Sequence, residues 1–64
     1  MKVKYDENAD VLYFRLSNLP VKESDEDKPG IIIDYAEDNS IVGIEILDVS
    51  KKNLQYEKVE YEKV

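Results

Sequence analysis

The sequence predicts a small, mainly β domain: an antiparallel β meander of four to six strands with a short helical turn near the C-terminus. The main observation is that residues 3–16 and 33–47 follow one plan, in which a short segment ending in Tyr and a five-residue spacer precede a second, apolar segment. The spacers, Asp6 to Asp10 and Ala36 to Ser40, contain Asp, Asn and Ser residues that favour chain reversal. Each segment therefore predicts an antiparallel hairpin.

The first hairpin is expected to contribute one edge strand and one inner strand. Lys2 to Tyr5 alternates polar and apolar residues, as a half-buried edge strand does. Asp10 to Ser17 has apolar side chains on both of its faces, with Arg15 as the only charge in its interior. A strand of this kind needs cover on both sides.

The middle of the chain predicts a polar segment, a turn and a second hairpin. Val21 to Asp27 is too polar for a core strand and is expected to be an edge strand or an extended loop, followed by a turn at Lys28-Pro29-Gly30. Ile31 to Tyr35 begins with three stiff β-branched residues and predicts a strand. Ile41 to Leu47 predicts the next strand, in which Gly43 indicates a bulge or a close backbone approach.

The C-terminal part divides into a helical turn and an extension. Asp48 or Ser50 is expected to cap the turn, whose C-terminal end carries two lysines. Residues 53–64 fit neither a wide helical stripe nor an uninterrupted strand, although Tyr and Val favour a strand. We expect an extra strand or arm that pairs with a sheet in its own or a neighbouring subunit, beyond a β domain over residues 1–52.

The length and composition favour self-association. A 64-residue chain buries only about 60% of the surface that its unfolded form exposes. Without Cys or His, neither disulfides nor thiolate or imidazole zinc ligands are available. We expect a homodimer in which one apolar sheet face packs on the C-terminal segment and the other on a second subunit. No export signal or membrane-length apolar run is present in this sequence, so a soluble cytoplasmic protein is expected.

The charge is unevenly distributed along the chain. The net charge is −6, but residues 6–48 carry 12 acidic and 3 basic residues, which gives −9, and the two ends together give +3. An acidic surface repels phosphate backbones, so no nucleic acid is expected as a partner. Such a surface steers a small basic protein partner towards the domain, or serves solubility alone.

Arg15 is the leading candidate for a functional side chain, because a buried guanidinium must find carboxylates or carbonyls. Asp34 and Glu45 lie within strong strands and are the expected partners of a bridge in the sheet or across a dimer. An anion-binding or catalytic Arg15 is the alternative.

The sequence predicts no catalytic residue, cofactor or metal. Carboxylates at residues 23 and 25–27 lack the ligand spacing of an EF-hand loop and are expected to be solvated. A sheet of this size offers little room for a carboxylate pair across a cleft, so no enzyme is expected. The Tyr residues are expected to cap the core and line an interface, because stacking platforms for nucleic acids have basic surroundings. The candidate ligand or interface residues are Arg15, Asp34, Glu45, Tyr13 and Tyr35.

Four blocks of the sequence occur together in a known arrangement: residues 3–6, 10–17, 29–35 and 41–50, the second containing Tyr-Phe-Arg-Leu-Ser and the fourth Gly-Ile-Glu-Ile-Leu-Asp. In this the chain resembles the DUF2283 family of small prokaryotic proteins over about residues 1–52. The resemblance implies a small β-rich fold and no reaction. Its members are often encoded beside small toxin-like proteins, which implies an antitoxin-like role. The Tyr-, Lys- and Glu-rich tail after Asn53 departs from the family pattern.

The sequence therefore favours a protein–protein interaction module, antitoxin-like and acidic, over the alternative of a small anionic-ligand binding or catalytic domain that uses Arg15. Interaction requires only a surface, whereas ligand binding requires a pocket.

Overall fold

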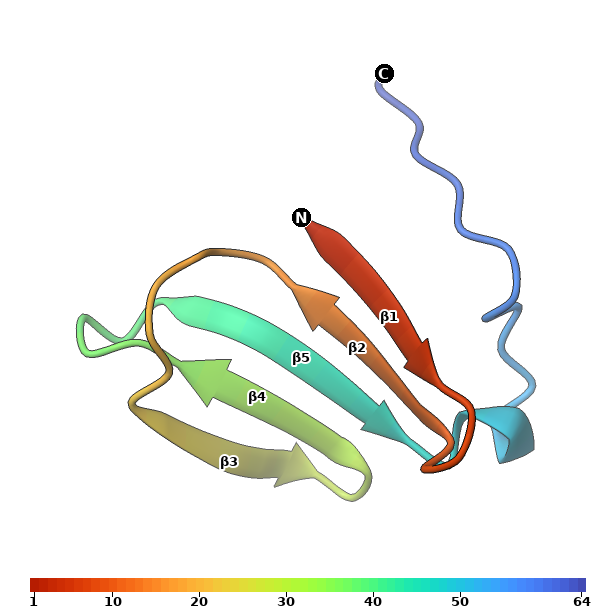
Figure 1. Cartoon of the computed structure of the whole chain (residues 1–64), viewed down its shortest axis with the longest axis horizontal. Helices are drawn as coiled ribbons and strands as arrows, with labels where there is room; N and C mark the ends of the chain where they lie inside the picture. Colours follow the sequence, from red (N-terminus) through yellow and green to blue (C-terminus); the bar gives the residue numbers. More distant parts are fainter.

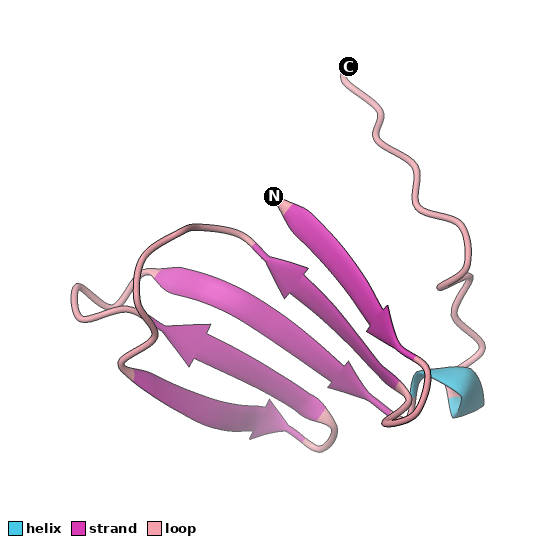
Figure 2. Ribbon diagram, viewed as in Figure 1, coloured by secondary structure: helices cyan, strands magenta, loops and turns pink.

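A computed structural model describes all 64 residues and contains one five-stranded antiparallel sheet (Figures 1 and 2). The strands are β1 (Lys2–Asp6), β2 (Val11–Arg15), β3 (Glu23–Lys28), β4 (Ile31–Tyr35) and β5 (Ile41–Leu47), and a single 3-10 turn, η1 (Val49–Lys51), follows them. Their order across the sheet is β1-β2-β5-β4-β3. The predicted fold class is confirmed, and the polar segment after residue 20 forms an edge strand, β3.

The two predicted hairpins are β1–β2 and β4–β5, and polar side chains hold their turns. In the first turn Asp6 Oδ1 accepts the backbone N–H groups of Asn8 and Ala9, both at 3.1 Å. In the second turn Asn39 has a φ of 68°, a left-handed conformation that Asn tolerates better than most residues. Both five-residue spacers form the hairpin turns that their composition predicts.

A longer connection carries the chain from β2, beside one edge strand, to β3, at the opposite edge. Residues 16–22 pass the ends of β5 and β4 (Figure 1), where Leu16 N–H donates to Val42 O and Lys22 N–H to Tyr35 O, each at 2.7 Å. Pro29-Gly30 then reverses the chain into β4, with Gly30 at a φ of 79°. The predicted turn at this position is confirmed.

The strand register gives the sheet two unlike faces. On the apolar face, one row across β1, β2, β5 and β4 is Val3, Phe14, Ile44 and Ile33, and the next is Tyr5, Leu12, Ile46 and Ile31. On the charged face, two rows run across all five strands: Lys2, Arg15, Gly43, Asp34 and Ser24, and Lys4, Tyr13, Glu45, Ile32 and Glu26. The prediction that both faces are apolar is wrong, because the register brings the polar residues of β1, β2, β4 and β5 to the same side, whereas the edge strand β3 is polar on both sides.

Burial is slight because the sheet forms a single layer. Extensive contacts between elements occur only between neighbouring strands, so no element packs across either face. Six of the 64 residues are buried, and Val42 and Val49 alone have completely buried side chains. Most of the apolar face is half-buried by contacts between adjacent side chains of the same sheet.

The C-terminal extension does not behave as an additional strand. Residues 53–64 form no strand and follow the outer side of β1 (Figures 1 and 2), where the rings of Tyr5 and Tyr56 lie 4.8 Å apart. Of the two forms expected for this segment, an extra strand or an arm, it takes the second within its own chain, and its contact with the apolar face is limited to Tyr56 against Tyr5. Val59, Tyr61 and Val64 are highly exposed, so the arm gains little from burial that would hold it against the sheet.

No helix here has the length and apolar character that crossing a membrane would demand, since η1 has only three residues.

Candidate functional site

The charged face contains a partly buried hydrogen-bond network centred on Asp34. Tyr13 Oη donates to Asp34 Oδ2 at 3.1 Å, and Ser24 Oγ donates to Asp34 Oδ1 at 2.6 Å. Asp34 is only 9% exposed, and every buried polar side-chain atom has a hydrogen-bond partner. Three strands are linked in this way, since Tyr13 lies on β2, Asp34 on β4 and Ser24 on β3.

Gly43 of β5 makes the link between β2 and β4 geometrically feasible. A Cβ atom placed at Gly43 would lie less than 3 Å from three atoms of Tyr13, which are its hydroxyl, Cζ and Cε1. The phenol therefore lies directly on the glycine backbone and reaches across β5 to Asp34. The predicted close backbone approach at Gly43 is confirmed, and its cause is an aromatic ring on the neighbouring strand.

Arg15 lies in the same row as Gly43 and Asp34, but it forms no ion pair with a carboxylate. Its Nε donates to Ser17 O at 2.7 Å and its Nη2 to Leu19 O at 3.0 Å. The only ion pair in the chain joins Lys58 to Glu60 in the exposed tail. The prediction of a bridge from Arg15 to Asp34 or Glu45 within the sheet is therefore wrong: the guanidinium instead satisfies backbone carbonyls where the chain leaves β2.

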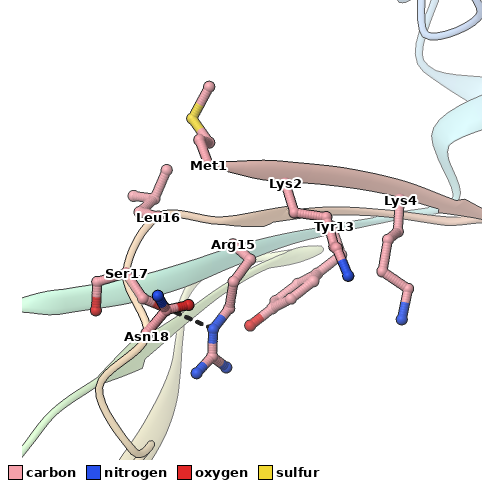
Figure 3. A pocket seen from close by; sticks show the side chains of 8 residues that line it. All are labelled: Met1, Lys2, Lys4, Tyr13, Arg15, Leu16, Ser17 and Asn18. Carbon is pink, nitrogen blue, oxygen red and sulfur yellow. Dashed lines mark hydrogen bonds between the residues drawn. The ribbon is translucent and has the colours of Figure 1, made fainter.

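A hollow of about 440 Å³ opens beside Arg15 at the β1–β2 edge of the charged face. Figure 3 shows the side chains of Lys2, Lys4, Tyr13 and Arg15 on one side of the sheet, whereas Met1 and Leu16 point to the other side. The register agrees with this view, because Lys2 is paired with Arg15 and Lys4 with Tyr13. Ser17 and Asn18, together with Met1 and Leu16 at its rim, complete the lining. Neither lysine was among the predicted site residues, although their alternation with Val3 and Tyr5 indicated that they share a face.

The other two predicted site residues occupy different positions. Glu45 lies opposite Tyr13 in the register and belongs to the charged face. Tyr35 lies at the end of β4, where alternation along the strand places it on the side of Ile31 and Ile33. Partial burial and the negative charges of Asp27, Asp25 and Glu23 raise the pKa of Tyr35. The structure thus brings together Arg15, Tyr13, Asp34 and Glu45, and separates Tyr35 from them.

Asp10 organises a second polar cluster that sequence reasoning missed. It accepts hydrogen bonds from Tyr5 Oη at 2.9 Å, from Ser50 Oγ at 2.7 Å and from the N–H of Ser50 at 3.1 Å. These bonds join the first hairpin to η1, and Asp10 rather than Asp48 receives the N–H group of Ser50; Asp48 makes no side-chain cap. The only signal in the sequence was an Asp at the end of a turn, where its φ of 57° is one that Asp tolerates.

The hydrogen bonds of this cluster change the proton affinities of both partners. The hydroxyl and N–H of Ser50 favour the ionised carboxylate and lower the pKa of Asp10. The hydrogen bond to the Asp10 carboxylate favours the protonated phenol and raises the pKa of Tyr5.

No group of three or more carboxylates converges to hold a metal ion. The acidic residues of β3 are all exposed and lie along an edge strand, so of the two alternatives expected for this segment the edge strand is present, with its carboxylates exposed to solvent.

The fold and the polar clusters define a small protein built on one antiparallel sheet. A family model described as a protein of unknown function (DUF2283) matches residues 2–50, which include all five strands. The chain therefore belongs to the DUF2283 family, as the four sequence blocks indicated, and its tail lies outside the matched region. No curated protein and no solved structure matches the chain.

Proposed function

We propose that this chain is a protein–protein interaction module that acts as a homodimer, with the apolar faces of two sheets packed against each other. The observation that carries the proposal is the largely uncovered apolar face: two rows of large apolar side chains cross four strands, and no helix or strand packs on them, although the ring of Tyr56 contacts Tyr5 at the edge of the face. Contiguous apolar surfaces of this kind mark interaction sites.

A second copy is the occupant that the size and shape of this face favour. The four strands that carry the apolar rows, spaced about 4.8 Å apart and about 17–20 Å long, project roughly 350 Å² on this face. Two such faces together give about 700 Å² in projection, which is in the range of weak, transient interfaces. A two-fold pairing of identical faces also requires no second gene product and converts a single layer into a two-layer sandwich.

The finer part of the proposal is an antitoxin-like module that binds a small basic protein at β3. All six residues of this edge strand are exposed, and four of them are acidic: Glu23, Asp25, Glu26 and Asp27. An exposed edge offers free backbone groups to an added strand, and the carboxylates favour a basic one. This role requires binding surfaces rather than catalytic groups, and we propose that the chain is not an enzyme.

Adjacent residues of β4 provide a matched test of the dimer. Ile33 belongs to the apolar face and Ile32 to the charged face, and both are half-buried. Ile33→Lys is expected to convert the dimer into a monomer, because it places an ammonium group in the interface. Ile32→Lys is expected to leave the dimer intact.

Analytical ultracentrifugation over a hundredfold range of concentration would measure this difference. The homodimer is refuted if the unmodified chain sediments as a monomer throughout. Equal effects of the two substitutions would show that the apolar face is not the interface.

The basic partner is tested separately by affinity purification from the native cell at low and high salt. We expect a basic protein in stoichiometric amounts that is lost at high salt, and lost also when Asp25 and Asp27 are changed to Asn. Retention of the same partner by this doubly substituted protein would refute β3 as its binding site while leaving the homodimer untouched.

A further inference from the structure

The cations of the hollow beside Arg15 form a group that the proposed interaction module does not use. Lys2 and Lys4 are two residues apart on one face of β1, which separates their Cα atoms by about 7 Å. Arg15 lies directly opposite Lys2, at the roughly 5 Å Cβ separation of cross-strand neighbours. Three positive charges thus border one hollow in a chain whose net charge is −6.

None of these three cations is neutralised by a carboxylate. The single ion pair of the chain lies elsewhere, between two residues of the tail. Lys2 and Lys4 are exposed, and no hydrogen bond from either ammonium group to the protein is present. The positive charge on this part of the sheet is therefore available to a ligand.

Two hydrogen bonds orient the Arg15 guanidinium and leave its other donors free. A guanidinium has five N–H donors. Two of them are directed to Ser17 O and Leu19 O, and three remain. Because the bonds to backbone carbonyls fix the plane of the group, the remaining donors lose less entropy when they bind an anion than those of a freely rotating side chain.

The carboxylates of the charged face are held away from this hollow or engaged elsewhere. Asp34 accepts the hydroxyls of Tyr13 and Ser24 on the far side of Gly43. Asp6 accepts two backbone N–H groups of its own turn. Glu45 does not line this hollow, but with Asp6 it lines a neighbouring one that Lys4 and Tyr13 also border. The positive potential is therefore strongest at the end of the hollow where Lys2 lies opposite Arg15, which is the end farther from these two carboxylates.

We propose that this hollow binds a small phosphate dianion, an inorganic phosphate or a phosphomonoester. Two ammonium groups and one oriented guanidinium on two adjacent strands suit the three oxygens and double charge of such a group better than a single carboxylate. The phenol ring of Tyr13 borders the same hollow and provides an apolar surface for an organic substituent. In the proposed homodimer the charged faces point outwards, so each dimer has two sites.

The direct test is an NMR titration of the full chain with inorganic phosphate and with phenyl phosphate at constant ionic strength. We expect saturable shifts confined to the amides around Lys2, Lys4, Arg15 and Ser17, with tighter binding of phenyl phosphate. The absence of saturation below about 10 mM would overturn the proposal. Tighter binding of succinate than of either phosphate would overturn the proposed ligand class.

Substitutions separate the site from general attraction to charge. Arg15→Gln is expected to weaken binding roughly tenfold or more, since a charge-assisted hydrogen bond is lost. Lys2 and Lys4 are exposed, so the double substitution to Gln leaves the fold intact and keeps the test valid if Arg15→Gln disturbs the connection to β3. Lys22→Gln and Lys51→Gln are the controls, because they remove equal charge outside the hollow. An equal loss of affinity in these controls would refute the site, and the outcome does not depend on dimer formation.

Discussion

The two faces of the sheet are built from the same strands, yet their polar and apolar groups are satisfied in opposite ways. The charged face meets its needs within one chain: Asp34 receives two hydroxyl hydrogen bonds and Arg15 is held by two carbonyls. The apolar face does not, because no element of the chain covers its rows. In a single-layer sheet, the polar side chains of a face can form hydrogen bonds with one another, whereas the apolar side chains of a face are buried only when a second layer covers them.

Gly43→Ala is expected to have the largest effect on the hydrogen bonds of the charged face. The added Cβ would collide with the ring of Tyr13, which must move and leave Asp34 with one hydroxyl donor. Overpacking and the lost hydrogen bond together are expected to cost about 2–4 kcal/mol in the free energy of unfolding. Urea denaturation measures this loss, which is large for a domain of this size.

A double-mutant cycle identifies the collision as the cause. In a Tyr13→Ala background the ring is absent, so Gly43→Ala is expected to be nearly neutral. If Gly43→Ala is equally costly with and without the Tyr13 ring, the close approach is not what requires glycine.

Ile33→Thr and Ile32→Thr test the two faces separately, because Ile33 belongs to the apolar face and Ile32 to the charged face. Thr keeps the β-branched shape, and each substitution is expected to cost about 1–2 kcal/mol in the isolated chain. If the apolar face is a dimer interface, the cost of Ile33→Thr rises with protein concentration, because dimer dissociation is coupled to unfolding. The cost of Ile32→Thr stays constant. Thermal unfolding at two protein concentrations distinguishes the two residues, and parallel behaviour would contradict the proposed interface.

The strands and turns were predictable because their signals are local. Alternation, β-branched runs and Asp- or Asn-containing spacers identified both hairpins, and Pro29-Gly30 marked the third turn. Which face of each strand joins which face of its neighbour was not predictable, because this depends on the register between strands. The error in treating both faces as apolar arose at this step, because the polar side of β2 faces the same way as the lysines of β1 on one side and Glu45 of β5 on the other.

The sequence predicted most residues of the candidate site, but not which of them contact one another. Arg15, Tyr13 and Asp34 were selected as charged or aromatic residues within apolar strands, and the register does bring them together. Carboxylates or carbonyls were expected as partners of Arg15, and Asp34 and Glu45 were chosen because they lie within strong strands. The carbonyls that it binds belong to the connection after β2, whose path has no sequence signal.

A smaller effect is expected from Tyr13→Phe, which leaves the ring on Gly43 and removes only its hydroxyl. Asp34 then keeps the hydrogen bond from Ser24 and loses one of its two donors. The expected cost is about 1–2 kcal/mol in the free energy of unfolding, with no change in oligomeric state. Denaturation and sedimentation of the same sample check both parts. A change in oligomeric state would indicate that the charged face also takes part in self-association.

The smallest effect is expected at the edge of the apolar face, where Tyr5 donates to the exposed carboxylate of Asp10. The hydroxyl of Ser50 is the main cause that lowers the pKa of Asp10 in the folded chain. The ionised Asp10 carboxylate therefore stabilises the fold above the carboxyl pKa of the unfolded chain, about 3.9. This stabilisation is lost as the pH falls through the lower pKa of the folded chain. The pKa of Tyr5 is raised by its hydrogen bond to Asp10, so its contribution is present below about pH 10 and is lost as the pH rises through the folded value.

Urea midpoints measured at acidic and alkaline pH separate the two groups. Asp10→Asn should weaken the acidic decline, because Asn tolerates the left-handed backbone of this position but does not titrate there. Tyr5→Phe should weaken the alkaline decline, and Tyr61→Phe, which removes a phenol that is 86% exposed in the tail, should leave it unchanged. If Tyr61→Phe has the same effect as Tyr5→Phe, the alkaline decline reflects general charge repulsion in an acidic chain rather than the hydrogen bond between Tyr5 and Asp10.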